Sequence, residues 1–143
     1  MAFGMPPITD FCFLVEDIER SVAFYRDKFG FKLRTKAPGF ADFTTKNVAL
    51  ALWEIDHIAA TVGISNKRSG PGVHKAVGAI EVATGAEVDA LYEELRGRGV
   101  DTFTSPPKEY PWRARCVYFT DPDEHLWEIY SWLDGKRFGE VNE

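Results

Sequence analysis

The stretch VEDIERSVAFYRDKFGF, residues 15–31, carries the clearest structural signal in the sequence. Apolar side chains recur in it at intervals of three or four, with charged residues between them: Ile18, Val22, Tyr25 and Phe29. That spacing is typical of an amphipathic helix with one apolar face. Gly30 comes next, and a residue without Cβ can adopt there the positive φ that ends a helix. The stretch therefore predicts a helix that follows Asp17 and ends at Gly30.

Strand-like runs lie on both sides of this helix. One β-rich run precedes it at residues 8–15, and three more follow at residues 31–35, 40–44 and 48–53. Turn sequences with Pro, Gly and Asn separate the three later runs. The order is therefore one strand, one helix and three strands.

The same order occurs a second time. A strand is predicted at residues 76–83, and Thr84 with Glu87 forms a capping-box signature for a second helix that ends near Gly97 and Gly99. Gly30 and Gly99 are 69 residues apart, and so are Val22 and Leu91, which lie at matching positions of the two predicted helices. Three strands are then predicted at residues 102–104, 115–120 and 126–132.

These elements predict an α+β fold made of two βαβββ modules. Module one covers about residues 7–55 and module two about residues 76–133, with an exposed linker at 56–75 and a polar tail at 134–143. One helix covers only one face of a four-stranded sheet, so the other faces are expected to bend around a cavity. We expect a single domain, residues 1–143, with a curved mixed eight-stranded sheet around that cavity.

Composition excludes several classes of function. The net charge is −5 and no long run of Lys or Arg occurs, so a nucleic-acid surface is not expected. No apolar run is long enough to span a bilayer, and the N-terminus lacks the pattern of a signal peptide. We therefore expect a cytoplasmic protein. Cys12 and Cys116 are far apart and are expected to be free thiols in a reducing compartment.

Two motifs resemble the vicinal oxygen chelate superfamily, which contains glyoxalases, bleomycin resistance proteins and dioxygenases. Residues 15–31 resemble the opening motif of its modules, and the run FTDPDEHLWEI at residues 119–129 resembles the closing hairpin. In this run Glu124 stands where the family has a turn glycine, so the turn type is expected to differ. The resemblance implies the fold above and a site on the concave sheet face, but it does not imply one reaction.

The resemblance also implies four inward positions at which metal-using members place ligands. These positions correspond here to Asp10, Ala51, Val77 and Glu128. Transition metals in this kind of site need three or four nitrogen or oxygen ligands, and Ala and Val supply none. We therefore expect no metal and no other cofactor. A divalent metal ion is the alternative, if His74 or a residue of a partner chain completes the site. Of the other two histidines, His125 in the closing turn is interpreted as solvated, and His57 flanks the central linker.

Period-two alternation assigns neighbours to the inward face. Phe11, Phe13 and Val15 are expected under the first helix, and Trp127 and Ile129 in the core. Trp112 lies on the loop that enters the seventh strand and is expected to cap the opening. The residues expected to line a ligand pocket are Trp53, Ala51, Val77, Trp112, Cys116, Tyr118 and Tyr130.

Two inward carboxylates, Glu128 and Asp10, in an aromatic pocket favour a cationic or aromatic small-molecule ligand. This is similar to the antibiotic-binding branch of the family. An enzyme would use the same residues differently: burial would raise the pKa of Glu128, which could then act as a general acid or base beside Asp10. A structural alternative is that Glu128 only accepts a hydrogen bond from Tyr118 or from a neighbouring strand.

Two more classes of function stay open. One is a metal-dependent lyase, isomerase or ring-cleaving dioxygenase, and the other is a protein-interaction module without a small-molecule ligand. The family resemblance and the need to cover sheet edges predict a homodimer.

Overall fold

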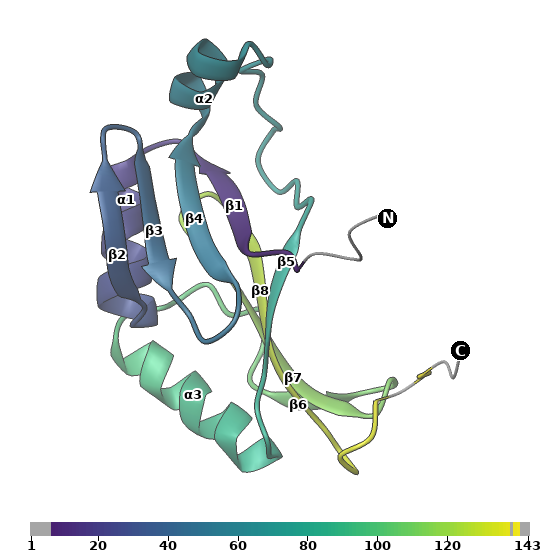
Figure 1. Ribbon diagram of the computed structural model, residues 1–143. Coiled ribbons are helices and arrows are strands. Elements are labelled where there is room, and N and C mark those ends of the chain that lie inside the picture. The colour runs from purple at the N-terminus through teal and green to yellow at the C-terminus, as the bar shows by residue number, and fades with distance from the viewer. Residues whose placement is uncertain (1–6, 138, 141–143) are drawn as a thin grey trace. The chain divides into compact units, whose positions relative to one another are not determined.

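The computed structural model of the chain describes residues 7–137, 139 and 140 (Figure 1). The chain divides into two compact units, unit 1 at Met1–Ser69 and unit 2 at Gly70–Glu143. The boundary between them falls inside the linker predicted at residues 56–75. Each unit is an α+β structure with a four-stranded mixed sheet, as the sequence predicts. The closure of eight strands around a cavity stays a prediction.

Unit 1 has the strand order β1-β4-β3-β2, in which β1 is parallel to β4 and the other pairs are antiparallel. Its elements are β1 (Asp10–Val15), α1 (Ile18–Ala23), the π-helical segment η1 (Phe24–Phe29), β2 (Lys32–Ala37), β3 (Phe40–Thr44), β4 (Ala49–Glu54) and α2 (Ile55–Val62).

The predicted first helix is confirmed as α1 followed by η1. Asp17 caps its start, since the carboxylate accepts hydrogen bonds from the backbone N–H groups of Glu19 and Arg20 at 3.0 and 3.2 Å. The helix widens at its end, where the N–H of Gly30 donates to the carbonyl of Tyr25, five residues earlier. Gly30 has φ 96°, as the sequence predicts for the residue that ends the helix.

Unit 2 repeats the arrangement, with the strand order β5-β8-β7-β6 and β5 parallel to β8. Thr84 begins its helix by accepting a hydrogen bond from the N–H of Glu87 at 3.2 Å, which confirms the predicted cap. The elements are β5 (Val77–Glu81), α3 (Gly85–Gly97), β6 (Lys108–Tyr110), β7 (Ala114–Thr120) and β8 (Leu126–Trp132).

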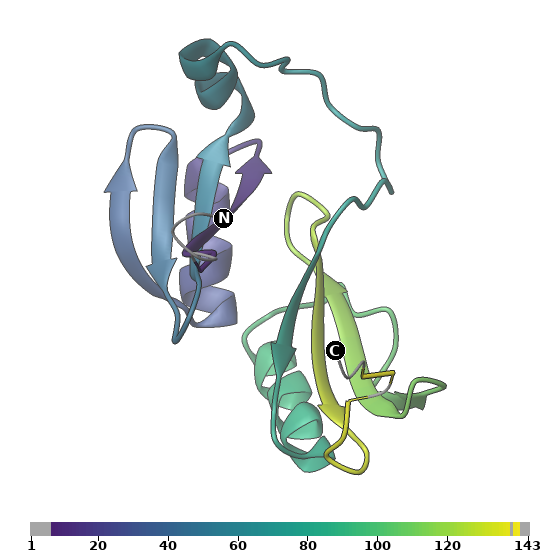
Figure 2. The same cartoon turned by 45° about the vertical axis from the view of Figure 1, so that its right-hand side comes forward.

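In each unit one helix covers one face of the sheet and leaves the other face open (Figures 1 and 2). In unit 1, α1 packs on β3 and β4, and in unit 2, α3 packs on β7 and β8. On β8 the helix-covered residues Trp127, Ile129 and Ser131 are buried, and the residues between them are partly exposed. The predicted alternation of Trp127 and Ile129 into the core is therefore confirmed.

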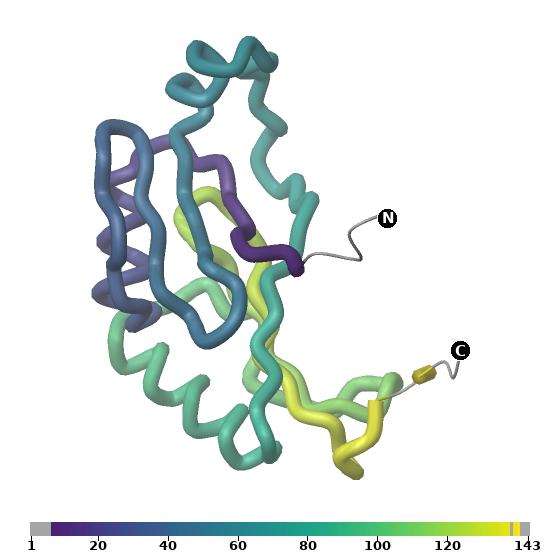
Figure 3. Tube along the Cα trace, in the orientation of Figure 1, coloured from purple at the N-terminus to yellow at the C-terminus, as the bar shows by residue number. Residues whose placement is uncertain are grey.

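Three sequence predictions about elements are wrong. Ile55–Val62 forms helix α2, where an exposed loop was expected. Between α2 and β5, residues 63–76 run without helix or strand (Figure 3). The edge strand β6 is Lys108–Tyr110 and not residues 102–104. Residues 102–104 still touch β7, because the N–H of Thr104 donates to the carbonyl of Tyr118 at 3.0 Å, but they form no ladder. Strand β2 begins one residue and ends two residues later than predicted.

Side-chain positions need two corrections as well. Phe11 is 53% exposed and makes an edge contact with Phe13, although it was expected under the helix. Phe13 and Val15 are buried, as expected. His125 was expected to be solvated, but its side chain is 20% exposed and lies 2.7 Å from the buried carboxylate of Asp121.

The closing turn keeps a glycine-like conformation although Glu124 occupies the glycine position. Glu124 has φ 64°, in the left-handed region that side chains other than glycine rarely adopt. Its carboxylate accepts hydrogen bonds from the N–H of Gly72 at 3.1 and 3.2 Å, and its carbonyl accepts one from Nδ1 of His74 at 2.6 Å. These contacts hold residues 72–74 against the turn and offset the backbone strain.

Among the residues that the structure describes, no helix combines the length and the apolar character needed to cross a membrane.

Gly78 tests the packing of β5 against the core of unit 2. A Cβ at Gly78 would lie 2.8–2.9 Å from three ring atoms of Trp127, which is itself buried. We expect Gly78→Ala to lower the free energy of unfolding by about 1–3 kcal/mol, because the indole has to move. Denaturant unfolding followed by circular dichroism measures the effect.

The matched control is Gly97→Ala in α3, where nothing lies within 4 Å of the added Cβ. This variant should be neutral or more stable by up to about 1 kcal/mol, because alanine favours helix. Equal destabilisation by both substitutions would contradict the packing described for β5.

Candidate functional site

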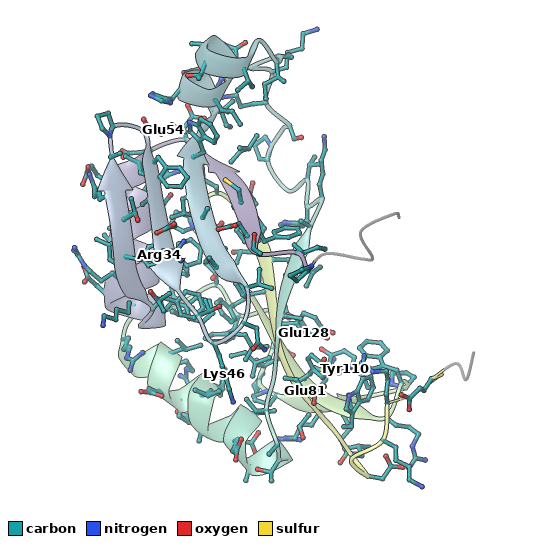
Figure 4. All side chains as sticks on the ribbon, viewed as in Figure 1. Arg34, Lys46, Glu54, Glu81, Tyr110 and Glu128 are labelled. Carbon is teal, nitrogen blue, oxygen red and sulfur yellow. The ribbon has the colours of Figure 1, made fainter. Side chains whose placement is uncertain are left out.

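The open face of unit 2 carries most of the predicted site residues. Glu128 on β8 lies opposite Ala79 on β5 and opposite Tyr118 on β7, and residues opposite one another in a sheet point to the same side. Figure 4 labels Glu81, Tyr110 and Glu128 on this sheet. We call the following residues the unit 2 open face: Val77, Ala79, Glu81, Lys108, Tyr110, Cys116, Tyr118, Leu126, Glu128, Tyr130 and Trp132.

Glu128 is held in place by Tyr118, whose hydroxyl donates a hydrogen bond to Oε2 of the carboxylate. Burial raises the pKa of Tyr118 far above its usual value, and the hydrogen bond to Glu128 and the nearby carboxylate charge raise it further. The phenol therefore stays protonated and acts as a donor. This hydrogen bond fixes the position of the Glu128 carboxylate, whether or not the carboxylate also contacts a ligand.

Two further aromatic rings lie next to Tyr118 in a chain of ring contacts. The ring of Tyr110 meets that of Tyr118 edge to face with centroids 5.5 Å apart, and it stacks on Trp112 at 4.7 Å. Trp112 lies in the turn between β6 and β7, as predicted, and Arg113 closes this turn with φ 64°. Its role as a cap stays a prediction. Lys108 places its ammonium group 5.2 Å from the centre of the Tyr110 ring.

Cys116 also lies on this face but is completely buried. Burial raises the pKa of the thiol, and hydrogen bonding by Trp112 acts in the opposite direction. A neutral buried thiol is a poor nucleophile. Cys116 therefore contributes a packing group at the base of the aromatic cluster, and Cys12 in unit 1 is a second free thiol.

A second polar group occupies the other end of the same face. Glu81 accepts hydrogen bonds from the hydroxyl of Tyr130 at 3.1 Å and from Nε1 of Trp132 at 3.2 Å. Arg137 approaches the same carboxylate at 3.8 Å. Sequence reasoning identified Tyr130 but missed Glu81 and Trp132, although strict alternation along β5 and β8 places both on the face. Val77 lies at the start of β5 and is 54% exposed.

Unit 1 presents Asp10, Ala51 and Trp53 on its own sheet. Ala51 is buried between Cys12 of β1 and Asp42 of β3 in the register of the strands. Trp53 donates from Nε1 to Nδ1 of His57 at 2.8 Å. Trp53 is therefore fixed by a neighbour in α2, a helix that the sequence did not predict.

Sequence reasoning missed a charge pair of unit 1 that has a buried carboxylate. Asp42 is only 6% exposed, and Arg34 holds both of its carboxylate oxygens, with Nε 3.1 Å from Oδ1. The hydrogen bonds from Arg34 lower the pKa of Asp42 below its usual range. A register shift at Leu33 and Thr35 lets Arg34, labelled in Figure 4, reach across to Asp42. The guanidinium also lies 3.7 Å from Asp10.

In the part of the chain that the structure describes, the donor groups do not fit a three- or four-ligand transition-metal site within either unit. Among the described residues, no group of three or more His, Cys, Asp or Glu side chains is placed to hold a metal ion. Ala51 and Val77, at two of the four expected ligand positions, have no side-chain donor atom. His74, the alternative ligand, points Nδ1 at the carbonyl of Glu124.

Comparison with known proteins agrees with the fold. The sequence model of the Glyoxalase/Bleomycin resistance protein/Dioxygenase superfamily matches residues 8–129 of this chain. A crystal structure of a glyoxalase/bleomycin resistance protein/dioxygenase from Nocardioides has a TM-score of 0.89 and 42% identity, covering 97% of this chain and 91% of its own. The uncharacterized protein YraH of Bacillus subtilis (strain 168) is 30% identical, covering 84% of this chain and 94% of its own length. A bleomycin resistance protein of Geobacillus stearothermophilus is 28% identical, covering 82% of this chain and 90% of its own length.

The pKa of Tyr118 tests the geometry of the Glu128 pair. In Glu128→Gln we expect this pKa to fall towards the ordinary value of about 10 but to stay above it, because burial remains. A folded-state pKa above the unfolded value contributes stability below about pH 10, and this stability is lost as the pH rises further. The loss above pH 10 should therefore be smaller in the variant.

Carbon-13 NMR of the tyrosine ring carbon bonded to oxygen follows this titration from about pH 8 to about pH 12. Tyr130 is the control in the same spectra, because burial and Glu81, not Glu128, raise its pKa. An unchanged Tyr118 titration in Glu128→Gln would contradict the proposed pairing.

Proposed function

Because this chain belongs to the glyoxalase/bleomycin resistance protein/dioxygenase superfamily, we propose that it binds a small organic cation on the open face of unit 2. The observation that carries the proposal is that Glu128 has a neutral hydrogen-bond partner and no cationic one among the described residues. Among the described residues, no Lys, Arg or His forms an ion pair with its carboxylate. Its hydrogen-bond partner Tyr118 is neutral, so the negative charge is available to a ligand.

The surroundings of Glu128 favour an organic cation over a hydrated metal ion. Tyr110, Tyr118 and Trp112 form a continuous set of ring contacts. A cation over an aromatic face gains about 0.5–2 kcal/mol, and the gain is larger where water is excluded. An ammonium or guanidinium group next to a flat apolar part would match both the carboxylate and the rings.

In this proposal Glu128 anchors the positive charge and Tyr118 positions the carboxylate. Trp112, Tyr130 and Val77 supply apolar contacts, and Cys116 supports the cluster from below. Asp10, Ala51 and Trp53 in unit 1 stay predicted site residues.

The Tyr118–Glu128 hydrogen bond also favours a second candidate function, proton transfer. A carboxylate fixed by a protonated tyrosine is a suitable general base for a C–H or N–H proton of a bound molecule. Turnover of a cationic ligand by wild-type protein, lost in Glu128→Gln, would support this candidate. Binding without chemical change supports the first one.

Glu128→Gln tests the binding role directly. The variant keeps the shape of the side chain and removes its charge. Affinity for benzyltrimethylammonium, measured by isothermal titration calorimetry at low salt, should weaken by about 1.5–3 kcal/mol, the range for hydrogen bonds to charged groups. The melting temperature should change little.

Glu109→Gln is the matched control. Glu109 lies on β6 opposite Arg115, on the other side of the sheet from Glu128, and its replacement removes the same charge from unit 2. This variant should bind the probe as the wild-type protein does. Equal weakening by both variants, or unchanged affinity in Glu128→Gln, would exclude the binding role of Glu128.

We also propose that the protein is purified without a metal and forms a homodimer. Strands β1 and β5 are sheet edges that expose Phe11 and Val77, and a second copy of the chain would cover such edges. Native mass spectrometry of protein prepared without chelator should show twice the chain mass of 16.1 kDa and no added metal. A monomer at all concentrations, or stoichiometric metal that EDTA removes, would contradict these two proposals respectively.

A further inference from the structure

The end of β8 carries a second group of residues that suits a cation. We propose that Glu81, Tyr130 and Trp132 form a subsite for a guanidinium-type group, and that Arg137 of the same chain occupies this subsite and competes with a ligand for it. The extension to a ligand with two positive groups rests on the proposed function of Glu128.

Tyr130 and Trp132 hold the carboxylate of Glu81 in a fixed position. The hydroxyl of Tyr130 and the indole N–H of Trp132 both donate to Oε1 of Glu81, at 3.1 and 3.2 Å. The two rings meet edge to face with centroids 5.4 Å apart. Two neutral donors fix the carboxylate through Oε1 and leave its negative charge and the indole face for a cation.

Arg137 shows which kind of group this subsite accepts. The centre of its guanidinium lies 5.6 Å from the centre of the Trp132 ring, and its Nη2 lies 3.8 Å from Oε1 of Glu81. A planar guanidinium over an aromatic ring next to a carboxylate is a favourable arrangement. The contact is loose, because the Arg137 side chain is 56% exposed and 3.8 Å is long for an ion pair. A ligand can therefore displace it.

Arg137 competes effectively with a ligand for the subsite, because a short segment of chain joins it to Trp132. Only five positions separate it from Trp132, and the turn between them is held by the N–H of Lys136 donating to Asp134 at 3.1 Å. A group tethered by so short a segment has an effective concentration of about the millimolar range or higher. A free guanidinium ion must exceed that concentration to replace Arg137.

The position of the subsite relates it to Glu128. Glu81 lies opposite Tyr130, and Glu128 lies two residues before Tyr130 on the same face of β8. Strand spacing and rise place the Cα atoms of the two glutamates roughly 8 Å apart. A ligand with two positive groups at that separation would contact both carboxylates, and binding would release Arg137.

Chemical rescue tests the subsite without assuming anything about Glu128. The Nε1–H resonance of Trp132, assigned by its loss in Trp132→Phe, reports on the indole. In Arg137→Ala this resonance should move away from its wild-type position. Ethylguanidinium should return it with a saturating dependence, at a half-saturation concentration roughly fivefold or more below that needed to perturb the wild-type protein.

Three further variants make the outcome specific. Arg137→Ala with Glu81→Gln should lose the rescue, because the carboxylate charge is gone. Lys136→Ala removes the same charge from the adjacent residue and should behave as wild type. Arg137→Ala with Glu128→Gln should keep the rescue, so a failure of the Glu128 proposal is distinguishable from a failure of this one.

No saturable response in Arg137→Ala would overturn the inference. An equal response in wild type and Arg137→Ala, or an undiminished response after Glu81→Gln, would overturn it as well. Agmatine, which carries guanidinium and ammonium groups, and the monocation butylguanidine test the extension to two charges. Agmatine should bind Arg137→Ala more tightly than butylguanidine does, and equal affinities would exclude a ligand that uses both glutamates.

Discussion

The packing of α3 against β7 and β8 determines where the chemistry of unit 2 lies. Trp127 and Ile129 are buried under the helix, and the alternation of a strand then forces Glu128 to the opposite side of the sheet. A shift of the register by one residue would expose the indole of Trp127 and bury the carboxylate, each at a high cost in free energy. The core of the unit therefore fixes the position of Glu128 before any ligand is involved.

The balance of charge on the open faces distinguishes Glu128 from the other carboxylates. Asp42 in unit 1 is neutralised by a two-point contact with Arg34. Glu81 has a weak partner in Arg137. Glu128 has a phenol as its partner, and burial keeps this phenol protonated. The cationic partner thus weakens from Asp42 to Glu81 and is replaced by a neutral donor at Glu128, which makes Glu128 the best candidate for a ligand.

The two modules carry acids at different positions of the same strand arrangement. In the strand register Ala51 lies opposite Asp42, as Glu128 lies opposite Tyr118. At this pair of opposite positions, unit 1 carries the acid on the third strand of the module and unit 2 carries it on the fourth. The two units share a backbone plan but present different chemistry on their open faces.

Local patterns in the sequence predicted the fold well where packing and capping agree, and the site only in part. The helix at residues 18–29 and the alternation along β8, which places Glu128 on the face of Tyr118, followed from apolar periodicity. Helix α2 escaped prediction although Ile55, Ile58 and Val62 recur in it at helical spacing, because the run was interpreted as part of the exposed linker. The Arg34–Asp42 pair depends on a shift in strand register, which leaves no local pattern. Alternation places Glu81 on the unit 2 open face, but its hydrogen bonds and ion pair join residues 49 to 56 positions apart and leave no local pattern.

The central claim is that an organic cation binds next to Glu128 on the open face of unit 2. A crystal structure with 4-bromobenzyltrimethylammonium tests it most directly, because the anomalous signal of bromine locates the probe without bias. The account predicts one main peak near Tyr110 and Trp112, with the ammonium group against the carboxylate of Glu128. A main peak on the sheet of unit 1 or on the helix-covered side of unit 2 would contradict it, as would no peak at a saturating probe concentration.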